Sequence, residues 1–183
     1  AFSYMKSLMS VQLAASVTSI GSHAFRTARS LAAIDIPDSV QTIGSYAFYD
    51  CASLTSVRLG VNSQLGSLGE AVFGATPSLR SFYWPVSLTS LYVDESDETT
   101  AFSYYGDSSI ENITMGDLSS IPSYAFSYIQ SLTSVQLAAS DTSIGSYAFR
   151  AARSLVAIVI PDSVQTIGSW AFLDCASLFS VRR

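Results

Sequence analysis

The chain carries few side chains of the kinds that catalyse reactions. His23 is its only histidine, so a Ser-His-Asp or Cys-His arrangement would have to use it. The same slot of a repeat described below holds Tyr46, Tyr124, Tyr147 and Trp170, which indicates a structural position. The histidine and cysteine content also excludes a transition-metal site, and the chain has no glycine-rich phosphate loop. Counting residues does not exclude a catalytic pair of carboxylates, but the Asp and Glu residues fall mostly in expected loops. The sequence therefore predicts a protein that is not an enzyme and needs no cofactor.

Cys51 and Cys175 hold the same position in two copies of a longer repeat. Five turns spaced by about 4.8 Å would separate them by roughly 24 Å, beyond the limit of about 7 Å between the Cα atoms of a disulfide. Each is predicted to be a small buried hydrophobic residue.

An acidic run at 94–98 places oxygen donors at alternate positions. Asp94, Ser96 and Glu98 are the candidate calcium ligands, and Asp107 would join them. Calcium needs about six to eight oxygens in a defined cage, and this run lacks the glycine and the fixed spacing of known calcium loops. The pattern therefore favours a solvated acidic bulge that holds no metal.

Asn112 begins the one N-x-S/T sequence of the chain, Asn112-Ile113-Thr114. In a eukaryotic secretory pathway this side chain would be a candidate for glycosylation. The glycan would then stand on a predicted strand, beside the acidic run.

Composition narrows the classes of partner. The net charge is −5, only 13% of the residues are charged, and no Lys/Arg cluster is present. A nucleic-acid site requires a basic footprint, and an anionic membrane surface requires a basic amphipathic helix. No apolar run approaches the roughly 20 residues that cross a bilayer. The sequence therefore predicts no nucleic-acid binding and no membrane insertion.

Two repeats of different length position these residues. Ala-Phe pairs, or Val72-Phe73, recur at intervals of 23 to 29 residues, with the phenylalanines at 2, 25, 48, 73, 102, 126, 149 and 172. In addition, residues 2–58 match residues 126–182 at an offset of 124, with differences such as Met5/Ile129, Val17/Asp141, His23/Tyr147 and Tyr46/Trp170. The chain is therefore predicted to be a single solenoid, 1–183, of about eight turns: unit 2–125 and a partial copy 126–183. The turns over 60–109 are irregular, and the whole is expected to be a segment of a longer array.

Each turn follows one pattern. L-x-x-V-x-L has the period of a short strand, which predicts strands at 8–13, 31–36, 54–59, 79–84, 110–115, 132–137 and 155–160. Pro37 and Pro161 would end strands, because proline cannot donate to a ladder. Glycines at 21, 44, 145 and 168 are expected at a corner, where a positive φ is easy for glycine. The S-Y-A-F-x-x-C segment fits one or two helical turns. A single turn cannot bury its own inner face, so the turns must stack.

The phrase I-P-D-S-V-x-x-I-G-S-x-A-F-x-x-C-x-S-L-x-x-V resembles the BspA-like leucine-rich repeat, the 23-residue Treponema-type class. The resemblance is specific at 8–59 and 132–183 and weaker between them. It implies an α/β-type repeat solenoid, a right-handed superhelix with a parallel concave β-sheet and short helical or irregular convex segments. It also implies an extracellular or cell-surface protein used in adhesion, although the functions of this family vary.

Stacking would align one outward side chain of each strand into a column across the predicted concave sheet. That column reads Gln12, Asp35, Arg58, Tyr83, Thr114, Gln136, Val159 and Arg182. A neighbouring column, including Asn112, is almost uniformly Ser and Ala, which would let a partner approach closely. Tyr and Arg are typical of interface hot spots, and the sequence predicts Arg58 and Tyr83 side by side. We therefore predict a module that binds a protein or glycan partner, with Gln12, Asp35, Arg58, Tyr83, Asn112, Thr114, Gln136 and Arg182 as the candidate binding residues.

A structural role is the alternative. Residues 1–7 and 179–183 show no polar capping repeat, which isolated solenoids need for solubility. Self-association end to end, as a fibre component or a subunit of a larger assembly, would cover such ends. The sequence does not decide between the two roles.

Overall fold

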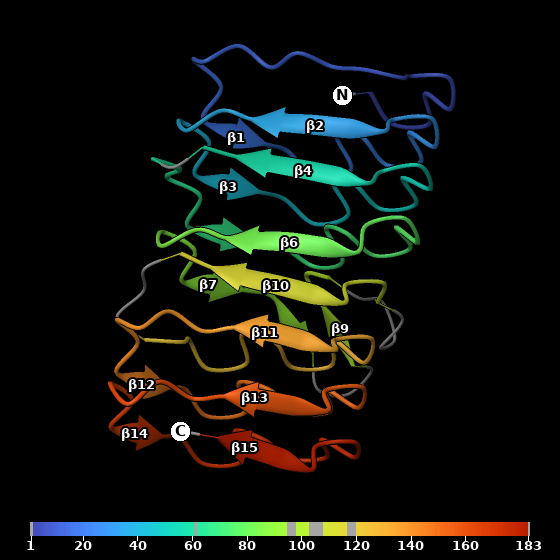
Figure 1. Ribbon diagram of the computed structural model, residues 1–183. Helices are drawn as coiled ribbons and strands as arrows, with labels where there is room; N and C mark the ends of the chain where they lie inside the picture. Colours follow the sequence, from blue (N-terminus) through green and yellow to red (C-terminus); the bar gives the residue numbers. More distant parts are fainter. Residues whose placement is uncertain (1, 61, 95–97, 103–107, 117–119, 183) are drawn as a thin grey trace.

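The chain forms a solenoid, a stack of turns in which strands of successive turns lie above one another (Figure 1). The structure is a computed structural model that describes residues 2–60, 62–94, 98–102, 108–116 and 120–182. The two termini lie toward opposite ends of the stack (Figure 1).

One row of seven strands supplies the main face of the stack. The row comprises β2 (Ala33–Ile36), β4 (Ser56–Leu59), β6 (Ser81–Trp84), β10 (Asn112–Met115), β11 (Ser134–Gln136), β13 (Ala157–Val159) and β15 (Ser180–Arg182). All its pairings are parallel: β2 with β4, β10 with both β6 and β11, and β13 with β15. The predicted parallel sheet is confirmed at six of the seven positions. The strand expected at 8–13 does not form.

A second, shorter row runs behind the first (Figure 1). It comprises β1 (Ser19–Ile20), β3 (Thr42–Ile43), β5 (Ser67–Leu68) and β7 (Ser90–Leu91), followed by β12 (Ser143–Ile144) and β14 (Thr166–Ile167). Ile43 and its equivalents Ile20, Leu68 and Ile144 are buried between the rows. β8 (Val93–Asp94) and β9 (Thr99–Thr100) pair antiparallel, at the two described ends of the acidic run.

The segment around each Ala-Phe pair is not helical, so the expected helical turns were wrong; no helix occurs in any of the described ranges. In the second turn, alternate residues donate to the following turn: Tyr46 N–H to Glu70 O (2.7 Å) and Phe48 N–H to Val72 O (3.0 Å). The intervening Ala47 donates to Gly44 of its own turn, at 3.2 Å. An α-helix would need every N–H for bonds within the segment. Here half of them join neighbouring turns, so the segment extends the stack.

This geometry places positive φ angles on residues with side chains. The residue two before the phenylalanine is left-handed at Tyr46 (φ 58°), and the residue two after it is left-handed at Asp50 (φ 57°). Equivalent residues repeat this in most turns, including His23, Thr27, Tyr147 and Ala151. The expectation that the corner glycines supply the positive φ was wrong, since none of them lies in the left-handed region.

Close packing explains the glycine instead. A Cβ at Gly44 would lie 2.5 Å from the backbone N of Ser22 in the preceding turn, whereas a Cβ at Gly21 would meet nothing within 4 Å. Both glycines occupy the same place in the same I-G-S motif.

We expect Gly44→Ala to lower the free energy of unfolding by about 3 kcal/mol, because the new methyl group overlaps backbone that cannot rotate away. Gly21→Ala is the matched control and is expected to change it by less than about 1 kcal/mol, because its methyl group enters open space. Urea unfolding followed by circular dichroism measures both. Equal losses in the two variants would show that the glycines act through backbone conformation and not through packing.

The core is a stack of aromatic rings. Phe2, Phe25, Phe48, Phe73 and Phe102 stack in sequence with centroids 5.2–5.7 Å apart, and Phe126, Phe149 and Phe172 form a second series at 5.0–5.1 Å. Trp84 contacts both series, at 6.3 Å from Phe102 and 5.0 Å from Phe126. Its side chain is fully buried and its Nε1–H donates to Leu88 O at 3.1 Å. The irregular middle turns therefore keep a continuous core through one tryptophan.

Candidate binding face

The sheet face is the outward side of the seven-strand row. Its central column is Asp35, Arg58, Tyr83, Thr114, Gln136, Val159 and Arg182, all of them exposed. The registers Asp35↔Arg58, Tyr83↔Thr114↔Gln136 and Val159↔Arg182 place these residues opposite one another. The small-residue column beside it is Ala33, Ser56, Ser81, Asn112, Ser134, Ala157 and Ser180. Gln12 is exposed but lies outside any strand.

Arg58 forms an ion pair with the residue opposite it in the preceding turn. Arg58 NH1 lies 3.1 Å from Asp35 Oδ1, and both side chains are well exposed, so the pair adds little stability. Tyr83 lies toward the following turn: a Cβ placed on Gly116 would lie 2.9 Å from its hydroxyl oxygen. The strands of Arg58 and Tyr83, β4 and β6, are neighbours in the row but belong to different sheets.

A third column borders the sheet face at the start of each strand and was missed in the sequence. We call it the leading column: Met9, Ala32, Thr55, Arg80, Glu111, Thr133, Val156 and Phe179. Most of these side chains are exposed, and Arg80 pairs with Glu111 at 2.6 Å. Each follows the first leucine or isoleucine of L-x-x-V-x-L, where the alternation of the strand breaks. That break is the sequence signal that could have revealed the column.

Two hollows open on the sheet face at equivalent junctions of the two units. The first, about 500 Å³, is lined by residues 10–13 and 35–37. The second, about 620 Å³, is lined by residues 134–137, 157–159, Pro161 and Arg182. The second hollow lies where the sheet is split, because β11 and β13 belong to different sheets. The row is therefore not a flat, uniform surface.

Both described ends of the acidic run, Asp94 and Glu98, contact other parts of the fold. Glu98 Oε2 accepts a hydrogen bond from Gln130 Nε2 at 2.9 Å, and Glu98 Oε1 lies 3.4 Å from Arg153 NH2. Asp94 on β8 lies opposite Thr99 on β9. Ser96 and Asp107 lie outside the described residues. Within the described ranges, no three His, Cys, Asp or Glu side chains gather as a metal site would require.

Asn112 is exposed on β10 between Ser81 and Ser134. His23 is exposed and stacks on Tyr46, with ring centroids 5.2 Å apart and planes 3° apart. Arg26 lies over Tyr46 at 5.6 Å, and Arg150 lies over Tyr147 at 5.5 Å in the second unit. The slot shared by His23 and the tyrosines therefore forms stacked aromatic pairs, His23–Tyr46 in the first unit and Tyr124–Tyr147 where the second begins.

Both cysteines are free thiols, Cys51 buried and Cys175 half-buried. The Cys51 Sγ donates to Phe25 O at 3.3 Å, and the Cys175 Sγ donates to Phe149 O at 3.0 Å. Burial raises the pKa of the Cys51 thiol to about 12 and that of Cys175 to about 11. The neutral thiol is therefore the stable form in the folded chain.

We expect both thiols to resist alkylation by iodoacetamide at pH 8 in the native chain and to react at once in urea. Only the thiolate is nucleophilic, and a pKa near 12 leaves about a thousandfold less thiolate than a free cysteine has. Cys175 should react before Cys51 as the pH rises. Because these pKa values are raised in the fold, their contribution to stability is complete below the pKa of an unfolded cysteine and is lost as the pH rises through about 11 to 12. Mass spectrometry of timed samples checks this. Rapid native labelling of Cys51 would contradict its burial.

Comparisons with known proteins agree with the fold. A model of the BspA type leucine rich repeat region matches residues 1–95 and 97–182 with six copies. A leucine rich cell surface protein from Faecalibacterium prausnitzii A2-165 has a similar structure, with a TM-score of 0.57 and 30% identity over 90% of this chain and 42% of its own. A leucine-rich repeat protein from Bacteroides ovatus ATCC 8483 shares the fold, with a TM-score of 0.58 and 22% identity over 98% of this chain and 56% of its own.

The chain thus spans about half the length of these relatives. No curated protein matches it in sequence. Among the residues that the structure describes, no helix is long and apolar enough to cross a membrane.

Proposed function

Because the chain belongs to the BspA-type leucine-rich repeat family, we propose that it is a non-enzymatic binding module whose sheet face engages a protein partner. The observation that carries the proposal is the face itself. Seven strands present exposed outward side chains of mixed chemistry, with the small-residue column beside them. Small residues let a partner approach the backbone, and exposed side chains such as Tyr83 and Gln136 offer specific contacts.

We place the module outside the cell or at its surface. The support is the similarity to the leucine rich cell surface protein of Faecalibacterium prausnitzii. Adhesion to other proteins is the role that we propose for this face. A glycan partner is the second class of ligand that the same face could accommodate.

A structural role, in which copies of the chain stack end to end, is the alternative. A rise in molar mass with concentration, measured by light scattering, would support this role, and a constant monomer would reject it.

The test of the binding proposal blocks the middle of the face. We expect Ser81→Arg, which adds a bulky side chain to the small-residue column on β6, to abolish binding to a panel of immobilised matrix and cell-surface proteins. Thr42→Arg, on β3 in the opposite row, is the control because it is also an exposed strand residue. Biolayer interferometry measures both. Binding that is lost equally in the two variants, or in neither, would reject the sheet face as the site.

A further inference from the structure

The second unit carries an apolar patch that its own copy in the first unit lacks. Residues 2–58 and 126–182 differ at eleven of 57 positions. Three of these positions gain a larger apolar side chain on the sheet face and its leading column: Ala32 becomes Val156, Asp35 becomes Val159 and Thr55 becomes Phe179. We call Val156, Val159 and Phe179 the apolar patch. Val156 and Val159 are 41% and 63% exposed, so burial in the core does not explain these two changes; Phe179 lies in the last turn of the chain.

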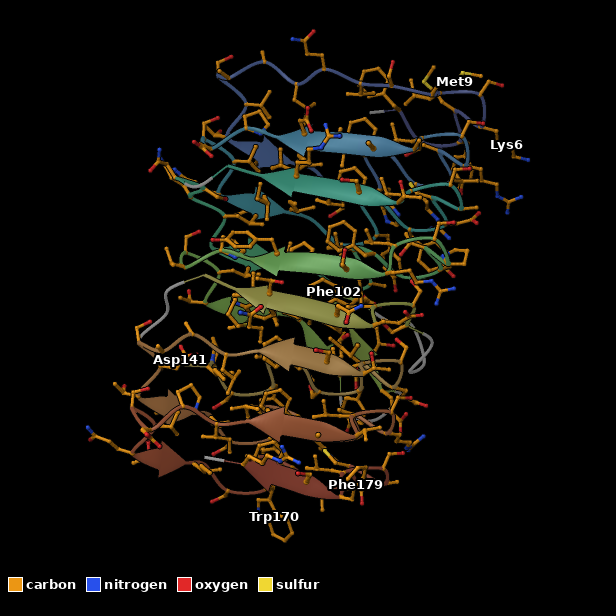
Figure 2. All side chains as sticks on the ribbon, in the orientation of Figure 1. Lys6, Met9, Phe102, Asp141, Trp170 and Phe179 are labelled. Atoms are coloured by element: carbon orange, nitrogen blue, oxygen red, sulfur yellow. The ribbon has the colours of Figure 1, made fainter. Side chains whose placement is uncertain are left out.

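The three patch residues occupy two adjacent turns. Phe179 N–H donates to Val156 O at 3.1 Å, which places the two residues side by side on the leading column. Val159 lies opposite Arg182 in the β13–β15 register. Figure 2 shows Phe179 at the start of β15. The turn that carries Val156 and Val159 has a neighbouring turn on each side in the stack, and both side chains are nevertheless exposed.

The change from Asp35 to Val159 removes the acidic partner of the equivalent arginine, Arg182. In the first unit, Arg58 pairs with Asp35 at 3.1 Å. In the second unit, Arg182 faces Val159, and none of the described carboxylates forms an ion pair with it. The strands β11, β13 and β15 contain no acidic residue, and Arg182 is their only charge. The local surface is therefore apolar and cationic, although the chain as a whole is acidic.

The apolar patch and Arg182 border the second hollow of the sheet face. Val159 and Arg182 both line the 620 Å³ hollow at the split between β11 and β13. The equivalent hollow of the first unit is lined by Asp35. Thr133 and Gln136, both exposed, border the patch on the preceding turn; Thr133 replaces the apolar Met9 of the first unit. An apolar patch with a polar rim is typical of a protein-binding site.

We propose that the apolar patch and Arg182 together bind an acidic, hydrophobic peptide segment of a protein partner. A large apolar side chain of that segment sits on Val156, Val159 and Phe179, and a neighbouring Asp or Glu pairs with the Arg182 guanidinium, whose fork matches a carboxylate. The first unit rejects the same segment, because Asp35 already neutralises Arg58 and repels a second carboxylate. This proposal rests on the proposed binding function; it adds the chemical class of the ligand and the part of the sheet face that binds it.

A swap between the units tests the proposal. A displayed library of random twelve-residue peptides is selected on the immobilised chain, and the enriched peptides are expected to carry an Asp or Glu beside Phe, Leu or Ile. The variant V156A/V159D/F179T copies the first unit onto the second, so its fold is already accommodated by the same backbone. It is expected to bind the selected peptide at least tenfold more weakly. The converse variant, A32V/D35V/T55F, is expected to bind two peptides per chain, as measured by calorimetry.

Three results would overturn the proposal: selected peptides without an acid, equal affinity in V156A/V159D/F179T, or a single peptide per chain in the converse variant. A ligand of this patch that proves to be a glycan on an array would overturn it as well. Its failure is distinguishable from that of the binding function. If Ser81→Arg abolishes partner binding while V156A/V159D/F179T does not, the face binds its partner elsewhere and only this inference falls.

Discussion

Trp84→Ala is expected to lower the free energy of unfolding by about 4 kcal/mol and to divide unfolding into two steps. Trp84 is fully buried and contacts Phe102 and Phe126, the ends of the two ring series. Loss of a buried tryptophan costs about 3–5 kcal/mol through lost burial and the cavity left behind. In a solenoid each turn contacts only its neighbours, so a weakened junction uncouples the parts on either side.

Trp84→Phe is the control for this prediction, because it keeps a ring at the junction and removes the hydrogen bond to Leu88. The remaining tryptophan, Trp170, lies in the second unit and reports on that unit in both variants. Circular dichroism and Trp170 fluorescence should give coincident urea transitions in Trp84→Phe and separate transitions in Trp84→Ala. Coincident transitions in Trp84→Ala would show that other contacts couple the two units.

Phe48→Ala is also expected to cost about 4 kcal/mol, but without dividing the transition. Phe48 is fully buried, with Phe25 and Phe73 stacked on its two faces at 5.2 and 5.7 Å. Its removal leaves a cavity within one unit, between turns that also share strand and backbone hydrogen bonds. The measurement is the midpoint and slope of urea unfolding.

Phe172→Ala supplies the comparison for Phe48→Ala. Phe172 stacks on Phe149 at 5.1 Å and is only half-buried, so its removal should cost clearly less. If the two variants lose equal stability, position in the ring series does not set the cost, and the stacked core is not the main source of stability.

The pattern of one turn was largely readable from the sequence. Buried residues such as Leu31, Ile34 and Ile36 follow L-x-x-V-x-L, and β2 ends before Pro37, where proline stops the ladder. These features follow from the local period of the strand, because inward and outward positions alternate within a few residues. Both cysteines, predicted as small buried residues, are free thiols, Cys51 buried and Cys175 half-buried.

Only part of the candidate binding face could be predicted from the sequence. The central column and its register were predicted, but the leading column and the hollows were not. The ion pair between Arg58 and Asp35 in the preceding turn was also not predicted. The environment of Asp141 (labelled in Figure 2) was also not predicted. Asp141 replaces Val17 of the first unit, is fully buried, and accepts a hydrogen bond at Oδ2 from Ala138 N–H at 2.9 Å.

The sequence by itself determined that the chain is a stack of leucine-rich turns, where each strand lies and which side chains point inward, because these depend on neighbours a few residues away. Only the tertiary structure decided that the Ala-Phe segments are not helical, that Tyr46 and not Gly44 takes the positive φ, and that β11 separates from β13. The physical reason is common to all three. Each depends on backbone contacts with the next turn, more than twenty residues away in the chain. The space left by that turn and its free hydrogen-bonding groups select among conformations that are locally similar in energy.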